Sequence, residues 1–168
     1  MKNVIKYIPV VLFTITFLVG CRSVKSMDDF YSKYNEKATV IPVPNFAVRW
    51  ANKATGGSPL FQHLKSSKVF ILSNVGDLKQ RVIMKDLNKS ANGDHFNKLV
   101  QWNKNNNNIK VYYLEKNGNV DRLLLGVNGF ENVLILDAKL NITQDILETL
   151  LNKINTNDIE FLKEILKK

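Results

Sequence analysis

The segment from Ile109 to Ala138 constrains the fold more than any other part of the chain. Its Asn117-Gly118 pair separates two strand-like apolar segments, which is the preferred composition of a tight type I′ hairpin turn. The Asn128-Gly129 pair repeats this arrangement, with room for a slightly longer turn. The sequence therefore predicts three consecutive antiparallel strands in the C-terminal half.

Other segments add strands to this meander. Residues 123–125 and 133–136 are apolar without alternation, which indicates a sheet covered on both faces. The run from Lys68 to Asn74 has the length and composition of a buried strand. The segment "ATVIPVP" contains two prolines, which cannot donate to a strand ladder, so it is expected at a sheet edge.

Helical periodicity marks the remaining segments. Ser26 and Asp29 have capping-box spacing at the start of the first helix, and a second helix is expected from Asn45. Two more are expected after the buried strand, and their apolar faces contain Leu78, Val82, Ile83 and Leu87 in one and Phe96, Leu99, Val100 and Trp102 in the other. Two C-terminal helices follow, with apolar stripes over residues 142–154 and 159–166. The predicted fold class is a single α+β domain with about five largely antiparallel strands, a C-terminal three-strand meander and helices packed on the sheet.

The N-terminus has the pattern of an export signal. Lys2 and Lys6 precede an apolar run from Tyr7 to Gly20 that contains no acidic residue. This run is shorter than the roughly 20 residues that a membrane-spanning helix needs. A secretory signal is therefore favoured over a permanent transmembrane anchor.

Leu18, Val19 and Gly20 precede Cys21, the single cysteine of the chain. The sequence "LVGC" resembles the lipobox of bacterial lipoproteins. The resemblance implies acylation of the Cys21 thiol and amine and cleavage after Gly20, because a thiolate is a good nucleophile for lipid transfer. The expected organisation is a signal peptide at 1–20, a lipidated cysteine with a short tether at 21–26, and one domain at 27–168. The alternatives are an ordinary cysteine after a secretory signal and an uncleaved anchor.

The charge balance bears on partners and location. Removal of residues 1–20 takes away two lysines and no acid, so the net charge falls from +9 to +7. A basic body close to anionic headgroups is attracted to them, although the scattered lysines also fit an ordinary solvated surface. Export disfavours nucleic acid as a partner. The five residues after Cys21 contain no acid, and we expect an outer-membrane lipoprotein that faces the periplasm.

Three segments resemble a known family. They are "DFYSKYNEKATVIPVPNFAVRW", "VYYLEKNGNVDRLLLGVNGFENVLIL" and "LNITQDILETL". Together they are similar to domain-of-unknown-function family 4252, small exported and often lipidated proteins of the Bacteroidota. The segment "DAKLNIT" departs from the family by lacking the usual glycine before the final helix. The resemblance implies no assigned activity and no catalytic residues.

Residues that could carry chemistry are few. His63 and His95 are the only histidines and have no cysteine or second histidine at metal-ligand spacing. Asp94 could orient His95 as a base, but an aspartate at this place is more typical of a helix N-cap. No catalytic motif is present, and we expect no enzyme activity, no cofactor and no metal.

Two classes of function remain. An interaction or scaffold module of the cell envelope would use the edge strand near Val40–Val43, or exposed aromatic side chains such as Trp50 and Trp102, to bind a protein partner. A small-ligand or lipid binder would need a cavity between sheet and helices. We favour the interaction module.

The lipobox interpretation predicts the behaviour of a Cys21→Ala variant. It should lack the mass of the acyl groups and should leave the membrane fraction, because no thiol remains for lipid transfer. Mass spectrometry and cell fractionation measure both effects. A variant that stays in the membrane with its signal intact would instead indicate an uncleaved anchor.

Overall fold

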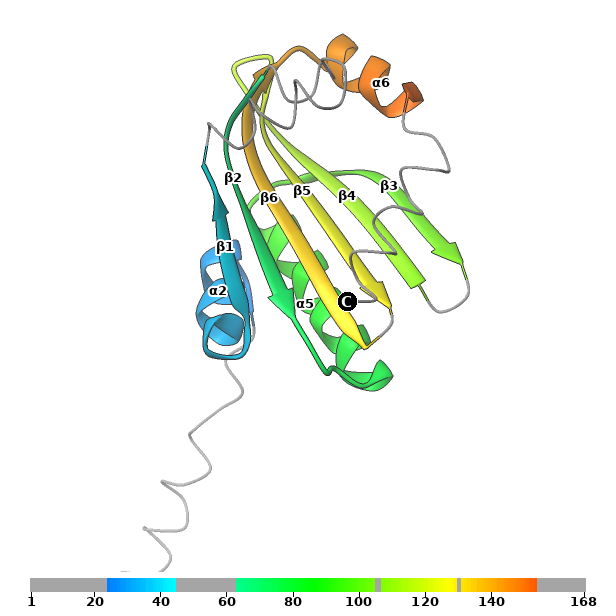
Figure 1. Ribbon diagram of the computed structural model, residues 1–168. Helices are drawn as coiled ribbons and strands as arrows, with labels where there is room; N and C mark the ends of the chain where they lie inside the picture. The colour runs from blue at the N-terminus through cyan, green and yellow to red at the C-terminus, as the bar shows by residue number, and fades with distance from the viewer. Residues whose placement is uncertain (1–23, 45–62, 105–106, 130, 154–168) are drawn as a thin grey trace, which may run out of the picture.

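The computed structural model describes residues 24–44, 63–104, 107–129 and 131–153. Figure 1 shows one sheet with helices on one face and at one end. The helices are α2 (Met27–Tyr34), the 3-10 helix η1 (Asn35–Lys37), α5 (Asp77–Gly93) and α6 (Gln144–Lys153). The strands are β1 (Thr39–Val43), β2 (Leu64–Leu72), β3 (Asn97–Lys104), β4 (Asn107–Lys116), β5 (Asn119–Gly129) and β6 (Asn132–Ile142).

The six strands form one sheet in the order β1-β2-β6-β5-β4-β3. Every neighbouring pair is antiparallel. The prediction of an α+β domain with an antiparallel sheet is confirmed, and so is the run of consecutive strands β4, β5 and β6. The strand count of five is too low, because β3 extends the meander by one strand.

The two Asn-Gly pairs behave differently. Asn117 and Gly118 both have positive φ, at 55° and 77°, and they connect β4 to β5 as the tight turn that the sequence predicts. At the second pair, β5 continues through Gly129, which pairs with Asn132 at the start of β6. Asn128 is therefore a buried strand residue, and the turn lies two residues later than the Asn-Gly pair indicates.

The helix predicted around residues 93–102 is wrong, because most of this segment is strand β3. The register between β3 and β4 shifts between Lys98 and Val100, which marks a β-bulge. Leu99 and Val100 consequently both pack against the same apolar cluster, although adjacent strand residues normally face opposite sides. Phe96 belongs to the main core on the opposite face of the sheet, so the three-and-four spacing of these residues in the sequence does not reflect one common face.

Helices α2 and α5 cover one face of the sheet (Figure 1). Their core contains Phe30 of α2 and Leu87 of α5, both fully buried, and Tyr112 and Ile135 of the sheet. Gly126 of β5 allows the closest approach. A Cβ atom at this position would lie 2.4 Å from Cδ2 of Leu87 and 3.2 Å from Cε of Met84. The helix therefore packs directly against the backbone of β5.

The opposite face of the sheet is also apolar. It carries two further clusters, one around Val120 and Leu140 and one around Val111 and Leu134. Leu147 of α6 belongs to the first of these clusters and is 2% exposed. The prediction that the strands are covered on both faces is confirmed for these positions.

The position of α5 is predicted correctly, but its buried face is not. Ile83 and Leu87 are buried as expected, whereas Leu78 is 79% exposed and Val82 is 51% exposed. Polar side chains occupy part of the inner face instead. The Gln80 amide donates to the carbonyl of Val75, and the Ser90 hydroxyl donates to the carbonyl of Asp86. These hydrogen bonds allow polar residues to be buried at positions where the apolar pattern predicts none.

Val24, the first residue that the structure describes, is 5% exposed and belongs to the main core. Ser26 caps α2 by accepting a hydrogen bond from the Asp29 amide, as its spacing predicts. The Lys25 carbonyl oxygen lies against Gly93, where an added Cβ would be 1.7 Å away. The segment before α2 is thus held against the C-terminal end of α5.

The remaining predictions concern the edge strand and two helices. Strand β1 lies at a sheet edge, as Pro42 and the neighbouring Pro44 predict. The helix expected from Asn45 and the last C-terminal helix, at 159–166, lie outside the described residues. Within the part that the structure describes, no helix is long and apolar enough to cross a membrane.

A Gly93→Ala variant tests the packing of the N-terminal segment on α5. Helix propensity alone would stabilise the protein, by about 1 kcal/mol. The clash with the Lys25 backbone should outweigh this gain and lower the free energy of unfolding by about 2 kcal/mol, as overpacking of a close contact does. Urea unfolding followed by circular dichroism measures the sign.

The neighbouring Asn92→Ala variant is the matched control. Asn92 is exposed and its substitution changes helix propensity without introducing a clash, so it should be neutral or stabilise by up to about 0.5 kcal/mol. If both variants are stabilised, the segment at Lys25 does not dock as the structure indicates.

Candidate functional site

The densest cluster of charged and polar side chains surrounds Asp137 of β6, which is 5% exposed. Arg122 of β5 donates two hydrogen bonds to its carboxylate, from Nε at 2.7 Å and from Nη2 at 2.6 Å. The Tyr31 hydroxyl of α2 donates to Oδ2 at 2.5 Å. Lys68 Nζ of β2 lies 3.6 Å from the same oxygen. We call these four residues the Asp137 cluster.

The sheet register brings the members of the Asp137 cluster together. Lys68 lies directly opposite Asp137 in the pairing of β2 with β6. Its Nζ also lies 3.6 Å from the centroid of the Tyr31 ring, a cation–π contact. The Arg122 guanidinium lies 5.6 Å from the Phe96 ring centroid. An aromatic ring therefore contacts each cation, which reduces the contact of the cation with water.

The electrostatics of the cluster favour a fixed ion pair. Burial alone would raise the pKa of Asp137, but the hydrogen bonds from Arg122 and Tyr31 and the charge of Arg122 outweigh it and lower the pKa. Burial and the neighbouring Asp137 carboxylate raise the pKa of Tyr31. At neutral pH, Asp137 is therefore an anion and Tyr31 a neutral donor, and neither suits proton transfer near pH 7.

A second cluster joins α2 to α5. The Asp86 carboxylate of α5 accepts hydrogen bonds from Lys33 Nζ at 2.6 Å and from the Tyr34 hydroxyl at 2.7 Å. Burial would raise the pKa of Asp86, but these hydrogen bonds and the charge of Lys33 lower it. Burial, with the hydrogen bond to Asp86, raises the pKa of Tyr34. This cluster is a second structural ion pair.

The residues that the sequence singles out for chemistry do not form a site. Asp94 is the C-cap of α5, and the predicted N-cap of a following helix is wrong. Its carboxylate instead accepts a hydrogen bond from the backbone amide of Met27, the first residue of α2, at 2.8 Å. His95 is exposed and has a φ of 62°. Across the described ranges, no group of three or more histidines, cysteines or acidic residues could hold a metal ion.

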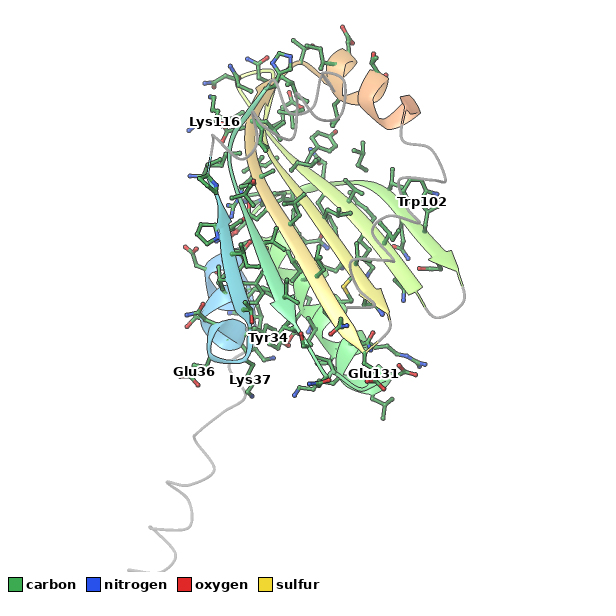
Figure 2. All side chains as sticks on the ribbon, in the orientation of Figure 1. Tyr34, Glu36, Lys37, Trp102, Lys116 and Glu131 are labelled. Carbon is green, nitrogen blue, oxygen red and sulfur yellow. The ribbon has the colours of Figure 1, made fainter. Side chains whose placement is uncertain are left out.

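The edge strands of the sheet carry exposed apolar side chains. Among the described residues, β1 pairs with β2 alone, and Val40 and Ile41 are 39% and 46% exposed. At the opposite edge, Trp102 of β3 is 42% exposed (Figure 2). Trp50, the other aromatic candidate, lies outside the described residues. The same is true of Cys21 and of the predicted cleavage positions 18–20.

The Asp137 cluster was not predicted from the sequence. Arg122 and Asp137 are among several charged residues that border apolar strand segments. A charged residue on the covered face of a strand needs a partner. The identity of that partner depends on the register between β5 and β6, which the sequence does not supply.

The chain belongs to the family described as "Domain of unknown function (DUF4252)", whose model matches residues 31–165. This match confirms the resemblance of the three sequence segments. The comparisons with curated proteins and with solved structures found no match.

A double-mutant cycle tests the Asp137 cluster. Asp137→Leu and Arg122→Met should each lower the free energy of unfolding by about 3 kcal/mol, because each leaves a buried partner without its counter-charge. The double variant should lose clearly less than the sum, since no unpaired charge of this pair remains. Chemical denaturation of the four proteins measures the coupling, and additive losses would contradict the ion pair.

The pH dependence of stability gives an independent test. The pKa values of Asp137 and Asp86 are lower in the folded state, so their stabilisation is complete above about pH 4, the ordinary aspartate value. It should be lost as the pH falls through the depressed values. The Asp137→Leu/Arg122→Met variant should show a flatter loss of stability below pH 4. An unchanged acid profile would show that Asp137 does not contribute to it.

Proposed function

We propose that the protein is a bacterial lipoprotein that is anchored to the cell envelope through Cys21 and acts as a non-catalytic interaction or scaffold module. The observation that carries the proposal is the edge strand β1, where Val40 and Ile41 are exposed and where, within the described part of the chain, only β2 pairs with the strand. An extended segment of a partner protein can add to such an edge through main-chain hydrogen bonds.

The burial of Val24 supports the anchoring. Val24 belongs to the core and lies three residues after Cys21. Three residues span at most about 11 Å. A lipid on Cys21 would therefore hold the domain close to the membrane surface, where its net positive charge is favourable. The location that we propose is the outer membrane, on the periplasmic side.

The packing of α5 bears on the alternative, a small-ligand or lipid binder. Such a protein needs space between its sheet and its helices. At Gly126 the helix contacts the strand so closely that a single Cβ would clash with Leu87. The ion pair between Asp86 and Lys33 also closes the contact of α2 with α5. This close packing favours the interaction module.

The charged clusters support a non-catalytic role. Asp137 and Asp86 are held as anions by neighbouring cations and tyrosine hydroxyls. Their hydrogen bonds connect α2 to the rest of the domain. We therefore interpret them as residues that position the helix next to β1.

Site-specific photo-crosslinking in cells tests the proposed partner strand. A photoreactive amino acid at Ile41 of the full chain should give one discrete protein adduct, because the partner strand would lie beside this residue. The same amino acid at Lys116, an exposed residue of β4, which β2, β6 and β5 separate from β1 in the strand order, is the matched control. The adduct should be absent there and should diminish in a Cys21→Ala background.

The outcome distinguishes the two classes of function. An adduct of the same size and yield at Ile41 and Lys116 would indicate collisions rather than a docking edge. If no protein is captured at either position and purified protein carries a stoichiometric lipid or metabolite, the interaction module is wrong and the ligand binder is correct.

A further inference from the structure

The solvent-facing side of α5 combines large exposed apolar side chains with basic ones. Leu78 and Val82, the two exposed apolar residues, lie one helical turn apart. Lys85 and Lys89 continue the same stripe at intervals of three and four residues, and both are exposed. Arg81, also exposed, borders the stripe. We call these five residues the outer face of α5.

The acidic residues of α5 do not neutralise this face. Asp86 is buried and bonded to Lys33 and Tyr34 of α2. Asp77 is exposed in the first turn, before the stripe begins. Among the described residues, no salt bridge joins Arg81 or Lys85 to a carboxylate. Lys89 contributes to the positive charge that lowers the pKa of Asp86, so the uncompensated positive charge of the outer face lies at Arg81 and Lys85.

Acidic groups on neighbouring elements lie at the ends of α5. The Glu131 carbonyl accepts a hydrogen bond from the Val75 amide, which places this residue beside the start of the helix (Figure 2). At the other end, the Asp94 carboxylate accepts a hydrogen bond from the Met27 amide. Neither group interrupts the stripe of Lys85 and Lys89.

The combination of residue types points to one kind of partner. A helix face with exposed aliphatic side chains and several lysines or arginines is typical of contact with an anionic membrane surface. Leu78 and Val82 would insert among the acyl chains just below the headgroups, and the basic side chains would contact the headgroup phosphates. Leu78 and Val82 are 79% and 51% exposed and lie one turn apart, so together they form a contiguous apolar patch beside the basic side chains.

The position of the chain's N-terminal segment agrees with such a contact. The Lys25 carbonyl lies against Gly93, at the C-terminal end of α5. Cys21 is four residues from Lys25, within about 14 Å. The 17-residue helix is roughly 25 Å long, with Leu78 near its other end. A lipid on Cys21 and an inserted Leu78 would hold α5 to the membrane at both ends.

We propose that the outer face of α5 is a second membrane contact, which binds the anionic phospholipid surface on which the acyl chains of Cys21 hold the protein. The inference rests on the proposed lipid anchoring for its biological setting, but not for its test. With two attachments, the domain would have one orientation on the membrane.

Vesicle co-sedimentation without the lipid anchor tests this contact. The protein is the chain 21–168 with Cys21→Ser, which contains every described element and the whole family match. The vesicles contain phosphatidylglycerol and phosphatidylcholine in equal parts, or phosphatidylcholine alone, at low ionic strength. We expect binding to the anionic vesicles and much weaker binding to the neutral ones.

Two pairs of substitutions separate the face from the overall charge. Arg81→Gln/Lys85→Gln should weaken binding by about 30-fold, since each basic residue near the surface contributes favourably. Lys65→Gln/Lys116→Gln removes the same charge from exposed positions on the strands and should have a much smaller effect. Leu78→Ser/Val82→Ser should weaken binding by about tenfold, because partial insertion of the two side chains is lost.

Defined outcomes would overturn the proposal. These are equal losses for the two charge pairs, equal binding to neutral vesicles, or no binding by the folded wild-type sequence. A concentration-dependent dimer that Leu78→Ser abolishes would show instead that the face binds a second copy. If the Cys21→Ala protein leaves the membrane in cells while vesicle binding fails, the anchoring stands and the α5 contact is wrong. If the protein binds vesicles but is not lipidated in cells, the α5 contact stands and the anchoring is wrong.

Discussion

The buried carboxylate of Asp137 is the interaction on which the arrangement of the helices and the edge strand depends. It joins four elements, because its partners come from α2, β2 and β5 and it belongs to β6 itself. A buried carboxylate without such partners would be strongly destabilising. The position of α2 is therefore coupled to the register of the central strands. Asp86 and Asp94 hold the same helix from α5, so three carboxylates of the domain fix the segment that follows Cys21.

This attachment of α2 determines which surfaces are open. Because α2 and α5 share one face of the sheet, the outer face of α5 remains exposed and β1 remains at an edge. The proposed anchor, Cys21, precedes Val24 by three positions in the chain, and Lys25 lies against Gly93 at the C-terminal end of α5. The domain therefore has two surfaces with different chemistry, a basic and apolar helix face and a strand edge with exposed Val40 and Ile41. A membrane can occupy the first while an envelope protein extends the second.

The sequence predicted those elements whose information is local. The turn at Asn117-Gly118 requires two residues with positive φ, and few residue pairs allow this conformation at low cost. Pro42 within β1, with Pro44 directly after it, similarly restricts the strand to an edge. Strand β3 was predicted as a helix because its bulge places Leu99 and Val100 on one side, and only pairing with β4 identifies it as a strand. The sequence predicts a turn at Asn128-Gly129 because Asn-Gly pairs favour turns, and no local pattern of comparable strength predicts the burial of Asn128.

The candidate surfaces show the same division between local and long-range information. The sequence by itself determined the family and the antiparallel meander, and it predicts the export signal with Cys21, because each of these patterns depends on residues that are close together in the chain. Only the tertiary structure decided that Leu78 and Val82 face solvent, that Gln80 and Ser90 are buried, and that Tyr31, Arg122 and Asp137 meet. These facts depend on strand register and on hydrogen bonds between residues up to 106 positions apart, which no local pattern encodes.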